Sequence, residues 1–236
     1  MAECAALLGR SKPSIWALLK RRGISRRPAV NVRHRAADDT FFDVIDSEAK
    51  AYWLGFISAD GSIKSKPSSV VTLTLAAKDA AHVHAFARAL QSTYKISDAV
   101  YDGFGQCRTS IVSERLVTGL KRLGVHSCKS LTIQPAVVAP ELVRHYWRGV
   151  VDGDGSIHRR ANGYYILNLV GTAEMLNGFV GVVEQQIDLA QPRITPNGSI
   201  YITSYANKKA RRVVNWLYSA ASIALARKVE LAQLAA

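Results

Sequence analysis

Apolar and polar residues alternate along the chain with two distinct periods, which predict strands and helices in a recurring order. Segments 70–90 (VVTLTLAAKDAAHVHAFARAL) and 164–184 (YYILNLVGTAEMLNGFVGVVE) each begin with the two-residue alternation of a half-buried strand and continue with helical spacing. Segments 107–125 and 199–218 repeat the order of strand then helix. Hairpin turns are predicted at Asp102-Gly103, Asn162-Gly163 and Asn197-Gly198.

This order of elements occurs twice because a sequence motif is duplicated. AYWLGFISADGSI at 51–63 and HYWRGVVDGDGSI at 145–157 align without a gap, with Asp60 and Asp154 in equivalent places 94 residues apart. The sequence therefore predicts an α+β fold made of two αββαββα repeats, residues 45–138 and 139–236, related by a pseudo-two-fold axis. The hairpins predicted within the repeats pair their strands antiparallel.

Each motif begins as an apolar helix with small residues four positions apart. The first helix contains Gly55 and Ala59, and the second contains Gly149 and Gly153. Small residues at this spacing lie on one helical face and allow two backbones to approach closely. Glycine inside a helix costs about 1 kcal/mol relative to alanine, which a close crossing offsets. We therefore expect the two motif helices to pack against each other at the pseudo-two-fold axis.

This packing is expected to bring Asp60 and Asp154 together at the C-terminal ends of the two helices. Carboxylates there face the negative end of the helix dipole and also repel each other. Bound cations are the natural compensation, and hard oxygen ligands beside phosphate suit Mg²⁺. A calcium loop of the EF-hand type is excluded, because glycine and glutamate are required where Ile157 and Gly163 stand. The motifs thus indicate metal-assisted hydrolysis of phosphodiester bonds.

The charge of the chain favours a polyanionic partner. The formal net charge is +13 and the pI is about 9.9. Residues 1–37 contain nine Lys and Arg against one acidic residue. Within this region, residues 1–24 are predicted to form a helix-turn-helix whose second helix enters a DNA groove, and residues 25–44 a basic linker. The residues predicted to contact DNA from this segment are Lys12, Ser14, Trp16 and Lys20.

Other features of the composition limit the class of protein. No apolar stretch approaches the ~18 residues of a membrane span, and the first residues, MAECAALLGR, do not resemble a secretory signal. The three cysteines show no C-x-x-C spacing, which argues against a zinc site or a disulfide framework. We expect a cytoplasmic, DNA-associated protein.

The two motifs, WLGFISADG at 53–61 and WRGVVDGDG at 147–155, resemble those of the LAGLIDADG homing endonucleases that carry two motifs in one chain. The resemblance covers residue 45 to the end. It implies a monomer whose two four-stranded sheets form a saddle over double-stranded DNA, and cleavage of both strands across the minor groove. It also implies Mg²⁺ as cofactor, with Mn²⁺ as an alternative and Ca²⁺ expected to support binding without cleavage.

Carried onto this chain, the resemblance makes Asp60 and Asp154 the catalytic, metal-binding acids, and Ala59 and Gly153 are included in the expected metal site. One position departs from the motif, since Ser58 stands where the second copy keeps Asp152. Because the final acid of the motif is the catalytic one in this family, activity is expected. Ser58 could still make the two halves of the active site unequal, so cleavage of only one DNA strand is an open alternative.

The strands are expected to read bases with the side chains that face away from the core. In the first repeat, Val71, Leu73 and Leu75 should point inward; in the second, Ile200 and Ile202 should do so. The predicted DNA contacts in the two repeats are Lys64, Lys66, Thr72, Thr74, Lys78, Arg108, Lys129, His158, Arg159, Arg160, Tyr201, Thr203, Tyr205 and Lys228.

Two other functions are compatible with the same fold. A DNA-binding regulator without cleavage activity would suit the basic N-terminal segment, but it would gain nothing from two repelling acids beside phosphate. An RNA maturase would bind structured intron RNA and would tolerate the loss of either acid. The two retained acids favour the endonuclease.

Overall fold

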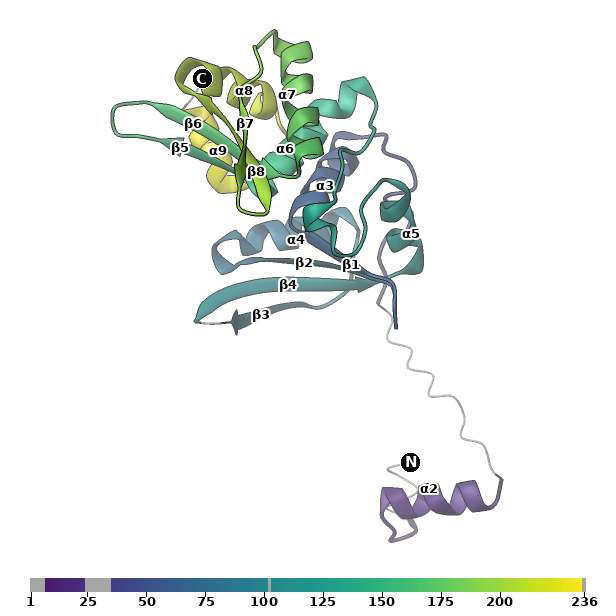
Figure 1. The fold of residues 1–236 in the computed structure, drawn as a ribbon. Coiled ribbons are helices and arrows are strands. Elements are labelled where there is room, and N and C mark those ends of the chain that lie inside the picture. The colour runs from purple at the N-terminus through teal and green to yellow at the C-terminus, as the bar shows by residue number, and fades with distance from the viewer. Residues whose placement is uncertain (1–6, 24–34, 102, 235–236) are drawn as a thin grey trace. The chain divides into compact units, whose positions relative to one another are not determined.

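Two helices that carry the duplicated motif lie side by side at the centre of the larger part of the chain (Figure 1). The first is α3 (Glu48–Ala59), which begins after the N-cap Ser47, and the second is α6 (Val143–Asp154). A short 3₁₀ helix, η3 (Pro140–Leu142), leads into α6, as the proline at its first position favours.

The structure is a computed structural model that describes residues 7–23, 35–101 and 103–234. The chain divides into two units, residues 1–34 and 35–236. The larger unit has the α+β fold expected from the sequence, with two αββαββα repeats. The first repeat contains α3, β1 (Gly61–Lys64), β2 (Val70–Ala76), η1 (Ala77–Asp79), α4 (Ala80–Ala89), β3 (Ile96–Tyr101), β4 (Phe104–Val112), α5 (Glu114–Arg122) and η2 (Lys129–Leu131). The second contains η3, α6, β5 (Gly155–Arg159), β6 (Tyr165–Gly171), α7 (Ala173–Ile187), β7 (Ile194–Asn197), β8 (Ile200–Ala206), α8 (Asn207–Tyr218) and α9 (Ala226–Gln233).

The strands of each repeat form one four-stranded antiparallel sheet. The strand order is β1-β2-β4-β3 in the first sheet and β5-β6-β8-β7 in the second, so the two sheets have the same topology. Glycines with positive φ close the turns at Gly103, Gly163 and Gly198, where the Asp-Gly and Asn-Gly sequences predict hairpins.

One face of each sheet is covered by helices and the other face is open. In β2, Val71, Leu73 and Leu75 are buried, which confirms their predicted inward orientation. The helices α4 and α5 pack on the first sheet, and α7 and α8 pack on the second. The buried faces of both sheets and the two motif helices form one hydrophobic core.

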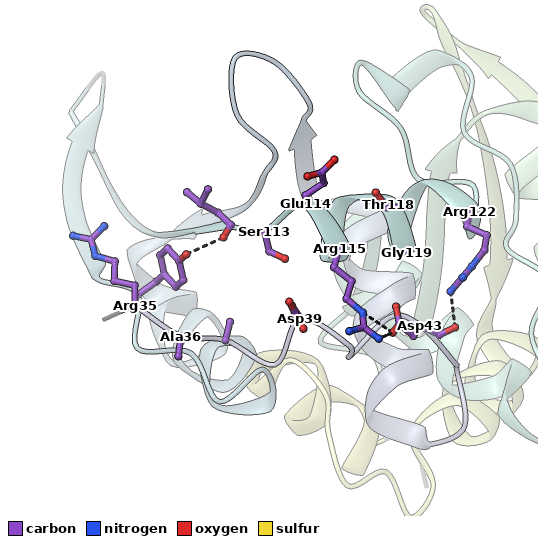
Figure 2. A pocket seen from close by; sticks show the side chains of 13 residues that line it. Arg35, Ala36, Asp39, Asp43, Ser113, Glu114, Arg115, Thr118, Gly119 and Arg122 are labelled. Carbon is purple, nitrogen blue, oxygen red and sulfur yellow. Dashed lines mark hydrogen bonds and ion pairs between the residues drawn. The ribbon is translucent and has the colours of Figure 1, made fainter. Parts of the chain in front are cut away.

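Residues 35–44 belong to the larger unit, although the sequence indicates a basic linker over 25–44. Phe41 and Phe42 are 6% and 1% exposed and join the core. Arg115 on α5 donates to Asp43 at 2.5 Å (Figure 2). In the sequence, this packing is indicated by the aromatic pair Phe41 and Phe42, which is unusual in a basic linker. Residues 24–34 of the predicted linker lie outside the described residues.

The smaller unit contains α2 (Lys12–Arg21), which lies in the region where the sequence predicts the second helix of a helix-turn-helix. Ser11 is the N-cap and its hydroxyl accepts from the Ser14 amide at 3.3 Å, Pro13 lies in the first turn, and Gly23 follows the end with a φ of 66°. Most of the predicted first helix of the helix-turn-helix lies outside the described residues. In the described part of the chain, no helix is long and apolar enough to cross a membrane.

Candidate functional site

The site is built on the crossing of α3 and α6, which is close enough to require glycine. A Cβ added at Gly55 would lie 2.0 Å from the main-chain oxygen of Tyr146, and one added at Gly149 would lie 2.1 Å from that of Tyr52. Both contacts are to backbone, so no rotamer change relieves them. The two helices therefore fix the position of each other's C-terminal end.

The crossing brings the two motif acids together at those ends. A Cβ added at Gly153 would lie 2.3 Å from the Cβ of Ala59 and 3.5 Å from the carboxyl carbon of Asp60. Asp60 is the C-cap of α3 and Asp154 is the last residue of α6. Burial, together with the charge of Asp60, raises the pKa of Asp154 to about 6. Burial also raises the pKa of Asp60, which is the more exposed of the two.

Two lysines bind main-chain oxygens next to the acid pair, one lysine in each motif's surroundings. Lys129 on η2 donates to the main-chain oxygen of Ala59 at 2.8 Å. Lys228 on α9 donates to the main-chain oxygens of Val151, Asp152 and Gly155 at 2.5, 2.8 and 2.7 Å. Burial lowers the pKa of both ammonium groups, that of Lys228 to about 8, while the nearby carboxylates oppose the shift.

The arrangement of Lys228 corrects the prediction that it contacts a DNA phosphate. Its side chain is 0% exposed, and its three N–H groups are all used by the three carbonyls on either side of Asp154. It holds the end of α6 rather than DNA. Lys129 is 8% exposed and lines a cavity of about 140 Å³ together with Asp154, so its contact with a phosphate stays a prediction.

The donor atoms at the acid pair fit a hard divalent cation. Within the described residues, no group of three or more His, Cys, Asp or Glu is close enough to enclose an ion. The ligands available are therefore two carboxylates and main-chain oxygens, which suits Mg²⁺ that keeps waters and binds phosphate. Ala59 and Gly153 can offer only main-chain oxygens, and that of Ala59 already accepts a hydrogen bond from Lys129.

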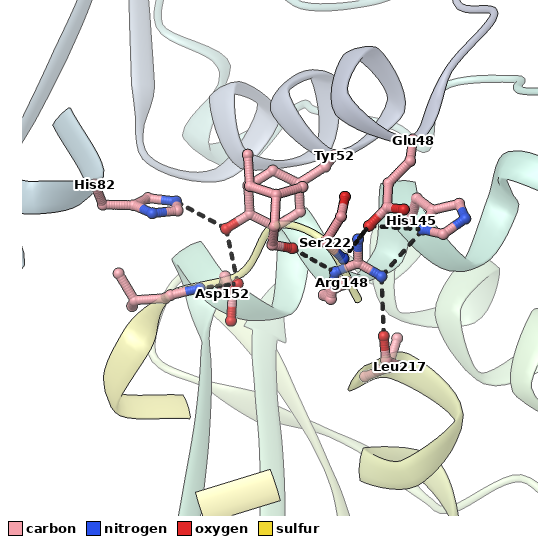
Figure 3. A network of polar contacts seen from close by, with 10 residues as sticks. Glu48, Tyr52, His82, His145, Arg148, Asp152, Leu217 and Ser222 are labelled. Atoms are coloured by element: carbon pink, nitrogen blue, oxygen red, sulfur yellow. Dashed lines mark hydrogen bonds and ion pairs between the residues drawn. The ribbon is translucent and has the colours of Figure 1, made fainter. Parts of the chain in front are cut away.

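The acid at the earlier motif position, Asp152, is buried between the repeats, and its carboxylate is held by groups of both repeats. It is 1% exposed and accepts a hydrogen bond from the Tyr52 hydroxyl at 2.8 Å (Figure 3). It also accepts from the Tyr218 hydroxyl at 2.6 Å and from the Leu225 amide at 2.7 Å. Burial raises its pKa, while these donors and Lys228 lower it. Asp152 is thus a structural anchor for the inter-repeat interface.

The first copy fills the equivalent place with Ser58, which is also buried. Its hydroxyl donates to the main-chain oxygen of Leu54 at 2.8 Å. Burial raises the pKa of Tyr146, and a hydrogen bond between Tyr146 and Ser58 opposes that shift. Tyr146 corresponds to Tyr52 in the other motif. The departure from the motif at position 58 therefore changes the inter-repeat packing and removes no ligand from the acid pair.

A second buried group in the same interface joins the start of α3 to the second repeat. Arg148 is 0% exposed and donates to Glu48 at 2.5 Å and to the main-chain oxygens of Leu217 and Ile223 (Figure 3). Its charge is paired and its guanidinium is hydrogen-bonded, as a buried arginine requires. Sequence reasoning missed this residue, since an arginine on an apolar helix gives no indication of its partner.

The open face of the first sheet carries most of the DNA contacts predicted for that repeat. Lys64 and Arg108 are exposed there, Thr72 and Thr74 are partly exposed, and the Thr74 and Arg108 positions are direct cross-strand partners. Five more of the predicted residues are exposed, on η1 and at strand ends and turns: Lys66, Lys78, His158, Arg159 and Arg160.

The orientation predicted for β8 is wrong by one residue. Thr203 and Tyr205 are each 1% exposed and pair with the buried Leu169 and Leu167, whereas Ile200 and Ile202 lie on the open face. The ring of Tyr205 packs edge-on against Phe179, with 6.2 Å between ring centroids. Tyr201 lies on the same face as Tyr205 and is 37% exposed at the strand end.

On the smaller unit, three of the predicted contacts can be placed. Trp16 is 48% exposed, and the Lys20 ammonium lies 5.5 Å from its ring centroid. Ser14 is exposed and hydrogen-bonds the Ser11 hydroxyl at 2.8 Å. The side chain of Lys12 lies outside the described part.

The larger unit has the fold of the LAGLIDADG homing endonucleases that join two domains in one chain. The homing endonuclease I-WcaI bound to its DNA recognition sequence matches with a TM-score of 0.58 and 13% identity over 89% of this chain and 97% of that chain. The meganuclease I-SmaMI bound to uncleaveable DNA matches with a TM-score of 0.56 and 10% identity over 80% and 90%.

A further match is the LAGLIDADG meganuclease I-AabMI bound to uncleaved DNA, with a TM-score of 0.52 and 13% identity over 78% of this chain and 90% of that chain. No protein-family model and no curated protein matches the sequence. At these identities the likeness establishes the fold, and the function has to be argued from the site.

Proposed function

We propose that the protein is a site-specific endonuclease that binds double-stranded DNA as a monomer and hydrolyses a phosphodiester bond on each strand with Mg²⁺. The observation that carries this proposal is the pairing of Asp60 and Asp154 at the ends of two crossing helices. A protein that only binds DNA has no use for two acids that repel each other and the phosphates.

The acid pair is unfavourable without a cation, which is why a bound metal explains it. The pKa of Asp154 is raised to about 6 by burial and by Asp60, so ionisation of both acids at neutral pH costs free energy. A divalent cation bound there would supply positive charge to the acids and to the phosphate undergoing hydrolysis. The neighbour structure of I-SmaMI on DNA with calcium ions supports the use of divalent metals on this fold.

The residues of this chain hold the acids and the DNA. Lys129 and Lys228 fix the main chain beside each acid. The strands β1 and β5 begin directly after the acids, so the open faces of both sheets start at the acid pair. The net charge of +13 favours the phosphate backbone. The exposed Trp16 and Lys20 of α2 add a second contact, and a helix-turn-helix there is part of the proposal.

The test is a two-step experiment on the full chain. A pool of double-stranded DNA with a randomised segment is bound in Ca²⁺, the retained DNA is sequenced, and the enriched sequence is cloned in a plasmid and incubated with Mg²⁺ or Mn²⁺. The proposal expects a linear product that requires Mg²⁺ or Mn²⁺. An Asp188→Asn variant is the matched control, because this exposed acid lies at the end of α7 and asparagine accepts its left-handed backbone.

The alternatives predict different results in the same experiment. A regulator would enrich a DNA sequence and leave the plasmid supercoiled under every metal condition. A maturase would prefer structured RNA over the DNA pool in a competition assay. Nicked plasmid without linear product would limit the activity to one strand.

A further inference from the structure

The two sheets can be compared position by position because one row of residues across each sheet is identical. The register places Gly, Leu, Thr and Ile side by side in both sheets, and the leucine and threonine are buried in each. The rows are Gly61, Leu73, Thr109 and Ile96 in the first sheet, and Gly155, Leu169, Thr203 and Ile194 in the second. This alignment identifies the equivalent positions on the two open faces.

On one side of the identical row, the open faces have the same chemistry. The first sheet has Ser62, Thr72 and Ser110, with 3.0 Å between the hydroxyl oxygens of the last two. The second sheet has Ser156, Asn168 and Ser204, in which the Ser204 hydroxyl donates to the Asn168 side chain at 2.7 Å. Both rows are polar and hydrogen-bonded within themselves.

On the other side of the identical row, the open faces differ. The first sheet has Thr74, Arg108 and Ser97, and the second has Val170, Ile202 and Thr195. Arg108 and Ile202 therefore occupy equivalent places. Val170, like Ile200 on β8, lines a cavity that also contains Asp154, so this end of the second sheet adjoins the acid pair.

Arg108 has the chemistry and the support to read a guanine. Its Nε donates to the Ser110 hydroxyl at 3.2 Å, which orients the guanidinium, and its side chain is exposed. Its two terminal nitrogens make no hydrogen bond to a described residue. An arginine held in this way can donate two hydrogen bonds to O6 and N7 of a guanine in the major groove.

Ile202 offers the opposite chemistry at the equivalent place. It is partly exposed on the open face between Val170 and Thr195, and the apolar pair Ile202 and Val170 has no hydrogen-bond donor in its side chains. Apolar side chains distinguish thymine by contact with its methyl group, and they leave the polar edge of a guanine without a partner.

We propose that Arg108 and Ile202 make the DNA target asymmetric. Arg108 specifies a G·C pair in the half-site under the first sheet, and Ile202 with Val170 specifies a T·A pair at the pseudo-symmetric position under the second. This inference rests on the proposed function, because it requires the open faces to contact DNA.

The test uses the binding selection in Ca²⁺, which needs no cleavage, on the wild type and three variants. In the wild type, one position is expected to be guanine and its pseudo-symmetric position thymine. Arg108→Ile is expected to lose roughly 5- to 150-fold discrimination for guanine at its position and to gain preference for thymine. Ile202→Arg is expected to gain guanine in the other half-site, where Ser204 stands as Ser110 does beside Arg108.

Arg88→Ile is the matched control, since Arg88 is exposed on α4, which packs on the opposite face of the first sheet. It removes the same charge and should leave the enriched sequence unchanged. Thermal unfolding of each variant checks that the fold is kept. Equal bases at the two positions in the wild type, or unchanged guanine discrimination in folded Arg108→Ile, would overturn this inference alone. A wild-type protein that enriches no DNA would overturn the proposed function as well.

Discussion

The helix crossing makes a quantitative prediction for the substitution Gly149→Ala. The added Cβ would lie 2.1 Å from the Tyr52 oxygen and 2.7 Å from the Phe56 nitrogen, against about 3.5 Å for an ordinary contact. The two helices would therefore have to separate by on the order of 1 Å, and because both contacts are backbone atoms a side-chain rotation cannot absorb the overlap.

The cost of such overpacking is about 1–3 kcal/mol and occasionally more, and about 1 kcal/mol is regained because alanine favours a helix over glycine. Because both overlaps are with backbone atoms, the cost lies at the upper end of this range, about 3 kcal/mol, and the net destabilisation is about 2 kcal/mol. For a unit of this size that lowers Tm by roughly 4–8 °C. The chain offers a matched control in Gly181→Ala on α7, where a Cβ meets nothing within 4 Å. That variant should gain up to about 1 kcal/mol.

The assay is thermal and urea unfolding of both variants beside the wild type, without divalent metal. Metal is left out so that a change in metal binding does not enter the comparison. If Gly149→Ala proved as stable as Gly181→Ala, the close crossing of α3 and α6, and with it the placement of the two acids, would be refuted.

Three further predictions concern the groups around the acids. Lys228→Met removes the ammonium donor shared by the main-chain oxygens of Val151, Asp152 and Gly155, of which that of Val151 keeps a second donor in the Gly155 amide at the helix end. The substitution should destabilise the protein by about 3 kcal/mol or more in urea unfolding; a loss below about 0.5 kcal/mol would contradict this. The pKa of Asp154 lies at about 6 in the folded state, above its usual value of 3.8, so stability without metal should fall as pH rises from about 4 to 6. Asp154→Asn should therefore match the wild type near pH 4 and exceed it by up to about 3 kcal/mol above pH 6, and a constant difference would argue against the pairing. Tyr52→Phe and Tyr218→Phe each remove a donor to Asp152, and each should lower the free energy of unfolding by about 1–3 kcal/mol. In a double-mutant cycle measured by denaturation, the two losses should not be additive. Strict additivity would show that the two hydroxyls do not share the carboxylate.

The duplication is the reason that so much of the fold follows from the sequence. Two copies of one motif, each followed by the same alternation of strand and helix, determine the αββαββα order and indicate the helix crossing through Gly55 and Gly149. The orientation of β2 can be predicted in the same way. Val71, Leu73 and Leu75 lie on one face of the strand, so that face is buried and the other is open.

The orientation of β8 could not be predicted in this way. Its pattern, IYITSYA, offers isoleucines on one face and tyrosines on the other, so the apolar alternation does not decide which face is buried. The packing of Tyr205 on Phe179 decides it, and that contact joins residues distant in sequence. The consequence for function is direct, since Ile202 rather than Thr203 lies on the open face.

The buried polar groups also depend on contacts that no local pattern indicates. Asp152 resembles a second acid of the site in sequence, yet its partners Tyr52 and Tyr218 come from α3 and α8. Lys228 resembles a surface cation at the end of the chain, yet it binds three carbonyls of the second motif. In both cases the partners are 66 or more residues away in the chain, so only the folded structure identifies them.

The most direct test of the central claim is cleavage of the selected target by the wild type, Asp60→Asn and Asp154→Asn in Mg²⁺, with all three proteins shown to bind that target in Ca²⁺. The account predicts linear product from the wild type and at least a thousand-fold slower formation of linear product by each variant, an effect on the order of 4 kcal/mol. Full cleavage by either variant, or the absence of any metal-dependent cleavage by the wild type on a target that it binds, would contradict it.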